Sequence, residues 1–321
     1  MKKLLAVLAL SLCSAASFAW EPPADKNVTA IVGFAPGSGN ELSFRGFSTI
    51  VQKNNPKFNY VIQNQPGADG VVAMNNFIGQ PSDGLHVYVA SHQGIWVTAD
   101  FFNKPAVKYS LSDFEYGLTL AKSPLVIIAS STSKTSTPKE LIDRLKTTKD
   151  PVTFAAGSGA HKLAYEFLME SIKGDRKLIT TVGYKGPQQA ANDVAGGHVE
   201  FGIVPVAVAN TLLKSGKVKM IGLCSEQKLP AIPDAPLMKD YVPGLNVYAA
   251  WGLVFPKHTH RELIDWYVRE YTKAIKSDEG KKFMFDNMMF NDGKELTPTG
   301  FEKSMMALRK QWIPIIEKMD N

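Results

Sequence analysis

Residues 31–42 read IVGFAPGSGNEL, and this stretch decides how the chain can fold. An apolar run rich in β-branched residues covers residues 28–34 and predicts a buried strand that ends before Pro36. Gly37 and Gly39 follow, and an amphipathic run over residues 40–54 predicts a helix. The first amides of a helix have no partner within it, and the helix dipole adds partial positive charge there. This strand, turn and helix therefore offer a place to hold an anion.

The second half of the chain repeats the same arrangement. A short predicted strand over residues 152–155 leads into Gly157, Ser158 and Gly159, and a helix is predicted over residues 161–172. Two helix N-termini of this kind could face each other across a cleft. We therefore expect the binding site to lie between the two halves.

Strand and helix patterns alternate along most of the chain, which predicts an α/β fold with parallel βαβ units. In such folds, the loops at the carboxyl ends of the strands form the site. The other strands are predicted at residues 58–63, 85–90, 125–129, 178–182, 199–204, 218–224 and 247–255. The other helices are predicted at residues 71–79, 138–146, 188–195, 261–276 and 302–318.

The first 19 residues have the features of an export signal. Lys2 and Lys3 form a basic start, residues 4–12 are apolar, and small residues precede the predicted cleavage point after Ala19. The apolar run is far shorter than the ~20 residues that a membrane span requires. We therefore expect a cleaved signal peptide and a periplasmic protein, in which Cys224 is the only cysteine and no internal disulfide can form.

The composition favours a small-molecule partner. Apolar residues make up 45% of the chain, and the formal net charge of +6 is spread without long basic runs, so nucleic-acid binding has little support. A zinc site is not expected, because the chain has no cysteine cluster. A dinucleotide site is not expected either, since Leu42 stands where the third glycine of that motif belongs.

Two sets of residues are candidates for binding a ligand. The first follows the two glycine turns, where hydroxyl and amide side chains could add to the backbone amides, or could serve only as helix caps. The second lies at strand ends and nearby turns, where His92 could instead be a solvated loop histidine and Tyr184 could pack a turn. Trp251 is more typical of a core residue than of a cleft floor. The candidates are Phe34, Gly37, Ser38, Gly39, Asn40, Ser91, His92, Gly157, Ser158, Gly159, His161, Tyr184 and Pro205.

An enzyme is the alternative class. Ser158 lies in a sequence that imitates a nucleophile elbow, with alanine in place of both outer glycines. A serine hydrolase would also require a general base, and no sequence feature brings His198 or His258 to Ser158. A binding protein that serves a signalling partner is the third alternative.

The motifs together resemble the substrate-binding receptors of tripartite tricarboxylate transporters, the Bug or TctC-type proteins. The matching segments are FAPGSG at 34–39, NQPGA at 64–68, PSDG at 81–84, GSG at 157–159, YKG at 184–186, GGHVE at 196–200 and WGL at 251–253. In this family the turns that correspond to residues 37–40 and 157–161 hold a carboxylate by backbone amides. The resemblance therefore implies a non-enzymatic receptor without a cofactor.

The resemblance also implies the architecture and the partners. It predicts a Venus-flytrap periplasmic binding protein, type II-like, whose chain crosses twice between two domains. Domain 1 would comprise residues 20–123 and 249–321, and domain 2 residues 124–248. A monomer of this kind would close on a dicarboxylate, tricarboxylate or aromatic carboxylate and deliver it to the subunits of a membrane permease. Several relatives carry a polar pair where this chain has Val204 and Pro205, so an apolar wall here would suit a ligand with a hydrocarbon body and no ammonium group.

Overall fold

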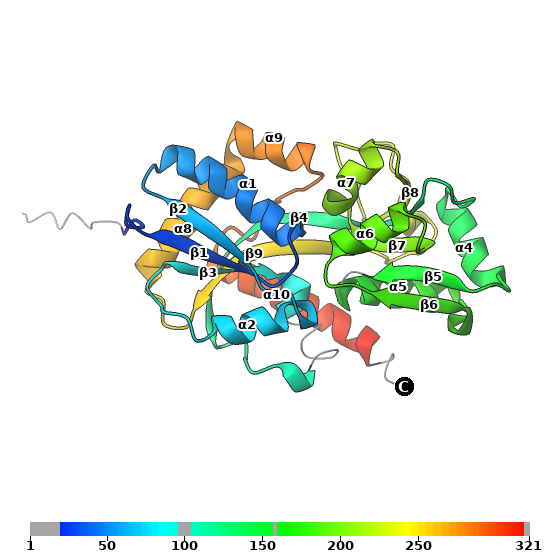
Figure 1. Cartoon of the computed structure of the whole chain (residues 1–321), viewed down its shortest axis with the longest axis horizontal. Coiled ribbons are helices and arrows are strands. Elements are labelled where there is room, and N and C mark those ends of the chain that lie inside the picture. Colours follow the sequence, from blue (N-terminus) through cyan, green and yellow to red (C-terminus); the bar gives the residue numbers. More distant parts are fainter. Residues whose placement is uncertain (1–19, 96–103, 157–158, 318–321) are drawn as a thin grey trace, which may run out of the picture.

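The computed structural model describes residues 20–95, 104–156 and 159–317. The predicted signal peptide, together with Gly157 and Ser158, lies outside these described residues. Within them, nine strands form one continuous sheet in the order β2-β1-β3-β9-β4-β7-β5-β6, with β8 paired to β4. Helices cover the sheet in two groups, one around β1–β3 and the other around β5–β8 (Figure 1).

The first half of the sheet consists of parallel strands joined by helices, as the sequence predicts. Strand β1 pairs in parallel with β2 on one side and with β3 on the other. The carboxyl ends of β1 and β3 consequently lie at the same edge of the sheet, which is the edge where ligands bind in such folds. The elements are β1 (Asn27–Val32), α1 (Gly39–Asn54), β2 (Asn59–Asn64), α2 (Val71–Phe77) and β3 (His86–Ser91).

The second half repeats this pattern, because β5 pairs in parallel with both β6 and β7. Its first helix has a complete capping box, in which Thr137 and Glu140 satisfy each other's backbone amides. The elements are α4 (Pro138–Thr147), β5 (Val152–Ala156), α5 (Gly159–Ile172), β6 (Ile179–Gly183), α6 (Pro187–Ala195), β7 (Phe201–Pro205), α7 (Val206–Lys214) and β8 (Val218–Cys224).

Two long antiparallel strands connect the halves. Strand β4 (Phe114–Ser130) pairs with β9 (Tyr248–Pro256) as far as Pro124, opposite Tyr248. From Leu125 onward, β4 pairs with β7 and β8 of the second half. Both strands pass through the middle of the molecule in Figure 1, so the chain crosses between the halves along β4 and again at the start of β9.

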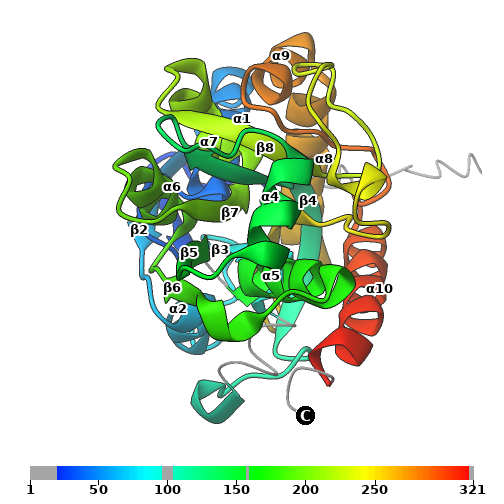
Figure 2. The ribbon, with the colours of Figure 1, turned by 90° about the vertical axis from the view of Figure 1, so that its right-hand side faces the viewer.

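The C-terminal helices return to the first half. They are α8 (Arg261–Lys276), α9 (Asp278–Asp286) and α10 (Pro298–Ile316). Helix α10 packs along β4 (Figure 2) and also contacts α5. Among the described residues, no helix combines the length and the apolar character that crossing a membrane requires.

Aromatic side chains fix α1 against α8 and thereby position the first turn of α1. Phe44 of α1 stacks on Tyr271 of α8 with ring centroids 6.1 Å apart, and Phe58 lies 5.4 Å from Trp266. A hydrogen bond of 2.6 Å joins the hydroxyls of Ser48 and Tyr271 inside this packing. Buried aromatic pairs stabilise a core beyond the area that they bury, so the N-terminus of α1 rests on a rigid support.

Candidate functional site

A cleft lies where the two halves meet, at the carboxyl ends of the parallel strands. The space between its walls, open solvent included, is about 380 Å³. Both halves and both connecting strands contribute to its wall. The described residues that line it are Phe34, Gly39, Asn40, Ser91, Gln93, Leu125, His161, Pro187, Pro205, Tyr248, Ala249 and Trp251.

The first turn of α1 forms one wall. Ser38 caps the helix by accepting the Glu41 amide at 3.4 Å, so its side chain serves the helix rather than the cleft. Gly39 and Asn40 follow and line the cleft. A Cβ on Gly39 would lie 2.0 Å from Cζ2 of Trp251. Only glycine therefore allows the start of α1 to lie against the indole.

The amide of Gly37 already has an anionic partner within the chain. It donates to Oε2 of Glu41 at 3.2 Å, and Oε1 of Glu41 pairs with Arg45 at 2.6 Å. Burial raises the pKa of the Glu41 carboxyl, but hydrogen bonds from Arg45 and Gly37 outweigh burial and lower the pKa overall. Gly37 itself lies outside the cleft wall, and the residues beyond it, Gly39 and Asn40, are the ones that line the cleft.

The second half supplies the opposite wall through three helix starts. His161 lies in the first turn of α5, Pro187 is the first residue of α6, and Pro205 immediately precedes α7. His161 is 3% exposed, and burial lowers its pKa to about 3, so its imidazole is neutral at physiological pH. Because Gly157 and Ser158 lie outside the described residues, their predicted contacts stay predictions, as does that of Gly159, whose backbone begins α5.

The floor of the cleft is apolar and belongs to the connecting strands. Leu125 comes from β4, and Tyr248, Ala249 and Trp251 come from β9. The side chain of Gln93 donates from Nε2 to the backbone carbonyl of Tyr248, and that of Asn40 donates from Nδ2 to the carbonyl of Val89 at 2.8 Å. The side chains of Gln93 and Asn40 are thus held in place by backbone carbonyls.

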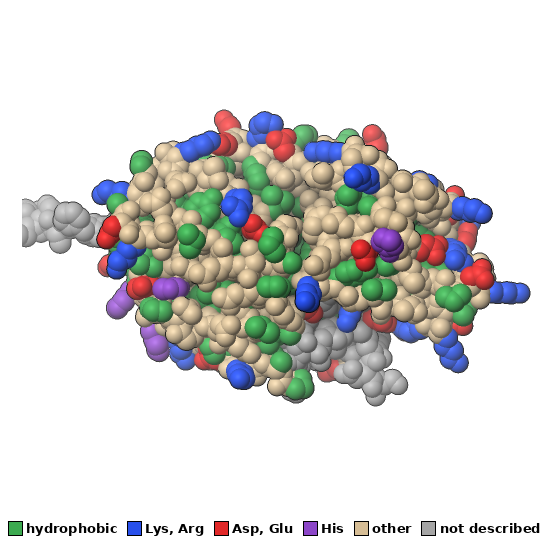
Figure 3. Space-filling model, viewed as in Figure 1, with side chains coloured by type: hydrophobic (Ala, Val, Ile, Leu, Met, Phe, Trp, Pro, Cys, Tyr) green, Lys and Arg blue, Asp and Glu red, His purple; other side chains and the backbone are tan. Residues whose placement is uncertain are grey.

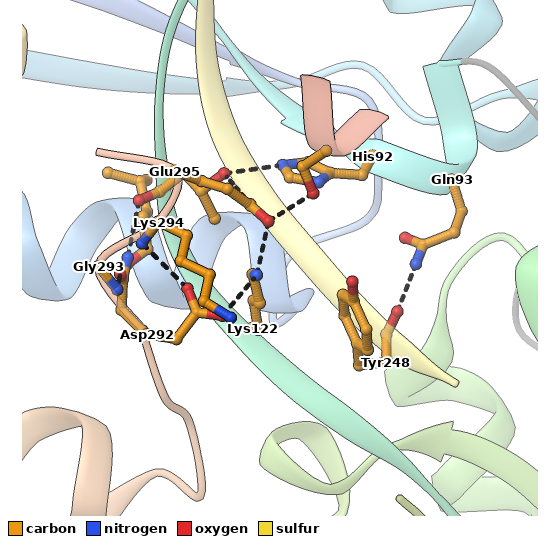
Figure 4. Close-up of polar contacts among 12 residues, drawn as sticks. His92, Gln93, Lys122, Tyr248, Asp292, Gly293, Lys294 and Glu295 are labelled. Atoms are coloured by element: carbon orange, nitrogen blue, oxygen red, sulfur yellow. Dashed lines mark hydrogen bonds and ion pairs between the residues drawn. The ribbon is translucent and has the colours of Figure 1, made fainter. Parts of the chain in front are cut away.

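His92 points away from the cleft into a buried polar cluster, shown in Figure 4. Its Nε2 lies 3.3 Å from the Thr119 hydroxyl, which donates to Glu295 at 2.7 Å. Glu295 also accepts from Lys122 at 2.6 Å. Burial lowers the pKa of His92 to about 3. His92 therefore belongs to the support beneath the cleft and not to its lining.

Tyr184 also lies outside the cleft lining. Its hydroxyl donates to Asp193 at 2.7 Å, and its ring packs against the apolar cluster of the second half. Burial, together with the neighbouring Asp193 carboxylate, raises its pKa to about 12. The structure thus brings Phe34, Gly39, Asn40, Ser91, His161 and Pro205 together around one cleft, and places Gly37, Ser38, His92 and Tyr184 outside the cleft lining.

The cleft is electrically neutral in its side chains. Among the described residues that line it, none is Lys, Arg, Asp or Glu. Basic and acidic side chains are instead interspersed over the outer face of the molecule (Figure 3). Within the described chain, no group of three or more His, Cys, Asp or Glu residues could hold a metal ion. An anion in the cleft would therefore depend on backbone amides and neutral donors.

Comparison with known families decides what kind of protein this is. The model for the tripartite tricarboxylate transporter family receptor, TctC, matches residues 53–319. The chain belongs to this family of transporter receptors. The match confirms the resemblance that the sequence motifs predicted.

Individual relatives of this TctC receptor agree with the family match. Protein BugT of Bordetella pertussis is 25% identical over 286 residues, which cover 86% of each chain. A protein encoded in the tcbD-tcbE intergenic region of a Pseudomonas species is 24% identical, over 85% of this chain and 82% of that protein.

Solved structures confirm the predicted two-domain periplasmic binding protein fold. The periplasmic binding protein BugD superposes with a TM-score of 0.83 at 23% identity, covering 92% of this chain and 97% of that one. MatC from Rhodopseudomonas palustris, solved with bound malate, gives 0.82 at 20% identity over 90% and 98% of the two chains. A further R. palustris protein, solved with adipate, gives 0.83 at 18% identity over 91% and 96%.

Six cleft residues were not among the sequence candidates. They are Gln93, Leu125, Pro187, Tyr248, Ala249 and Trp251. Gln93 could have been found, since it directly follows the two strand-end residues that were chosen, Ser91 and His92. Trp251 was weighed as a cleft floor but assigned to the core; it is buried and also lines the cleft. Leu125, Tyr248 and Ala249 gave no signal, because an apolar residue of a connecting strand has the same sequence pattern as one in a core.

Proposed function

We propose that this receptor captures a small organic carboxylate in the cleft and delivers it to a membrane permease of the tripartite tricarboxylate type. The observation that carries this proposal is the convergence of helix starts from both halves on one neutral cleft. The first residues of α1 contribute from one side and the first turn of α5 from the other; Pro187, at the start of α6, has no N–H and contributes apolar surface. Helix N-termini favour negative charge and present free amides to it.

Helix dipoles alone would bind too weakly. A dipole contributes about 0.3–2 kcal/mol, whereas micromolar affinity requires about 8 kcal/mol. Several charge-assisted hydrogen bonds in a closed cleft would supply the difference, because such bonds are stronger than those between neutral groups and gain further where water is excluded. The backbone amides of Gly39 and Asn40 would make them on one side, with the turn at Gly157 and Ser158 as the predicted counterpart.

Binding would couple to closure of the two domains, whose boundaries are those that the sequence predicts. The ligand would contact both halves only in the closed form and would stabilise that form over the open one. The closed form would then dock on the permease, in the periplasm. MatC with malate and the related protein with adipate show the same fold with organic acids bound, which supports a carboxylate as the ligand here.

A thermal-shift screen tests this proposal. The mature protein, unfolded and refolded to remove carried-over ligand, is heated at low salt with a panel of monocarboxylates, dicarboxylates and tricarboxylates. A ligand that binds only the folded state raises the melting temperature by mass action. A clear shift with one class of acids is expected, and a flat panel would contradict the proposal.

The same panel separates a receptor from the alternative of a serine hydrolase. A receptor returns every acid and every ester unchanged, and Ser158→Ala lowers its affinity at most. A hydrolase shows turnover that Ser158→Ala abolishes. We expect no turnover in the wild-type protein or in Ser158→Ala.

A further inference from the structure

Gln93 has a fixed orientation beside the cleft floor. It follows β3, is 2% exposed and lines the cleft. Its Nε2 donates to the backbone carbonyl of Tyr248, as Figure 4 shows. A carbonyl can only accept, so the amide nitrogen must face Tyr248 and Oε1 must face the other way. The Tyr248 carbonyl therefore determines that Oε1, and not the amide nitrogen, is the atom of the Gln93 side chain left to pair with another group.

That acceptor lacks a partner. Oε1 of Gln93 is buried and has no hydrogen-bond partner among the described residues. Three other buried side-chain atoms of the described chain share this state, on His92, Asn210 and Thr272, but none of those residues lines the cleft. Leaving a buried acceptor unpaired costs stability, so a partner that paired with Oε1 would be stabilising. Gln93 lines the cleft, so a ligand donor that reaches Oε1 after a small shift of this side chain would satisfy it.

The rest of the lining restricts what that donor can be. An ammonium group would find no carboxylate among the described cleft residues, and burying an unpaired cation is costly. A second carboxylate would find no Lys or Arg there and would be repelled by the lone pairs of Gln93 Oε1. Leu125, Pro187 and Pro205 contribute apolar surface. A hydroxyl on a hydrocarbon body meets all three conditions.

We propose that Gln93 is a specificity-determining residue, and that the ligand is a hydroxylated monocarboxylate whose hydroxyl donates to Gln93 Oε1. The inference rests on the proposed function, in which the helix starts hold the carboxylate. Gln93 then accepts a hydrogen bond from the hydroxyl at the other end of the ligand. Sites built to pair with a substrate hydroxyl discriminate strongly against the analogue that lacks it, because the buried partner is left unsatisfied.

Matched pairs of acids that differ by one hydroxyl test this inference. Calorimetric titration of the refolded mature protein would compare 3- and 4-hydroxybenzoate with benzoate, lactate with propionate, mandelate with phenylacetate, and malate with succinate. We expect at least one hydroxylated monocarboxylate to bind about 10-fold or more tighter than its partner. Equal affinity within every monocarboxylate pair, or a dicarboxylate that binds tighter than all monocarboxylates, would overturn the inference and leave the carboxylate receptor intact.

Gln93→Met then assigns the preference to this residue, since methionine keeps the length of the side chain and removes both polar groups. The hydroxyl preference should fall to within about 2-fold, while the acid without the hydroxyl binds as before. The control is Gln80→Met, at a half-buried position outside the cleft where the amide nitrogen donates to the Asn76 carbonyl; it should keep the full preference. A preference that survives in Gln93→Met would refute the role of Gln93. If no acid of any kind binds to the wild-type protein, the proposed function itself fails.

Discussion

At the scale of single residues, the contact between Gly39 and Trp251 controls the shape of the cleft. Gly39→Ala would place a Cβ 2.0 Å from the indole, so the first turn of α1 or the Trp251 ring must move. We expect a loss of about 1–3 kcal/mol in the free energy of unfolding, as for other overpacked sites, together with weaker ligand binding. Urea unfolding and calorimetric titration measure the two effects.

Gly183→Ala is the matched control for this substitution. A Cβ at Gly183 would meet no atom within 4 Å, and the change should alter the free energy of unfolding by less than about 0.5 kcal/mol. If Gly39→Ala is as stable as Gly183→Ala and binds ligand equally well, the close contact with Trp251 does not shape the cleft.

Buried histidines make the stability depend on pH. Burial lowers the pKa of both His92 and His161 from 6.5 to about 3. Below pH 6.5 these histidines bind protons in the unfolded chain but not in the folded chain. Their contribution to the free energy of unfolding is therefore fully present above pH 6.5 and is lost as the pH falls toward 3. Each histidine should remove roughly 1.5 kcal/mol between pH 6.5 and pH 5.

Urea unfolding at several pH values across this window tests the prediction, since carboxylate titration contributes mainly below it. His161→Asn should remove about half of the pH dependence. A free energy of unfolding that stays constant from pH 6.5 to pH 5 would show that the two histidines are not held neutral by burial.

The site could be predicted from the sequence only where a residue type signals its own role. Gly39 and Asn40 were found because a glycine turn before a helix has a recognisable pattern. The position of Gln93 directly after Ser91 and His92 was a usable signal, but its orientation was not predictable, because it depends on the Tyr248 carbonyl, 155 residues away. His92 was chosen for its position at a strand end, but its neighbours Thr119 and Glu295 direct it into the support beneath the cleft.

At the scale of elements, the start of α1 has two roles, capping the helix and presenting amides to the ligand, and experiment can separate them. Ser38 caps α1 beside the cleft, and Thr137 caps α4 far along the chain. Ser38→Ala and Thr137→Ala should each lower the free energy of unfolding by about 0.5–2 kcal/mol, because each removes one N-cap. Only Ser38→Ala should also weaken ligand binding, since it loosens the turn that presents the Gly39 and Asn40 amides.

Thermal unfolding and calorimetric titration of both variants check this difference. Equal loss of affinity in the two variants would mean that binding responds to global stability alone. Unchanged affinity in both would remove the first turn of α1 from the binding site.

Most elements were predictable, because strands and helices carry their own periodicity and caps. The exception of greatest consequence is β4, which was predicted over residues 125–129 and extends from Phe114 to Ser130. Lys122 and the following Ser123 and Pro124 interrupt its apolar pattern. Lys122 can nevertheless be buried within the strand because Glu295, 173 residues away, pairs with it. A local pattern cannot reveal a partner at that distance.

Two further helices, α7 and α9, were not predicted. The apolar residues at the start of α7 directly continue the apolar run of β7, so no change of pattern marks the boundary. Helix α9 is short, but Ser277 followed by Asp278 and Glu279 is a helix-start signal that could have identified it.

At the scale of the whole molecule, the proposed closure would depend on close approach of the two halves beside the cleft. A Cβ on Gly186, which caps α6, would lie 3.7 Å from Cβ of Ala35 in the opposite half. Its backbone is extended, so a side chain is tolerated locally. Gly186→Leu should therefore hinder closure and weaken ligand binding by about 10-fold or more, with a loss of about 1 kcal/mol of stability because leucine is a poorer N-cap than glycine.

Small-angle X-ray scattering with and without ligand measures closure directly. The radius of gyration should fall on ligand addition in the wild-type protein and in Gly183→Leu, but not in Gly186→Leu. Normal closure and affinity in Gly186→Leu would show that the approach of Gly186 to Ala35 is not part of the closed form.

The most direct test of the central claim is a crystal structure of the mature protein with the acid that gives the largest thermal shift. The account predicts the carboxylate in the cleft, within hydrogen-bond distance of the first amides of α1 on one side and of the start of α5 on the other. A second groove, lined by Leu229, Met284 and Phe285 among others, has an empty volume of about 560 Å³ and offers an alternative place. An acid bound there, or anywhere outside the cleft between the two halves, would contradict the account.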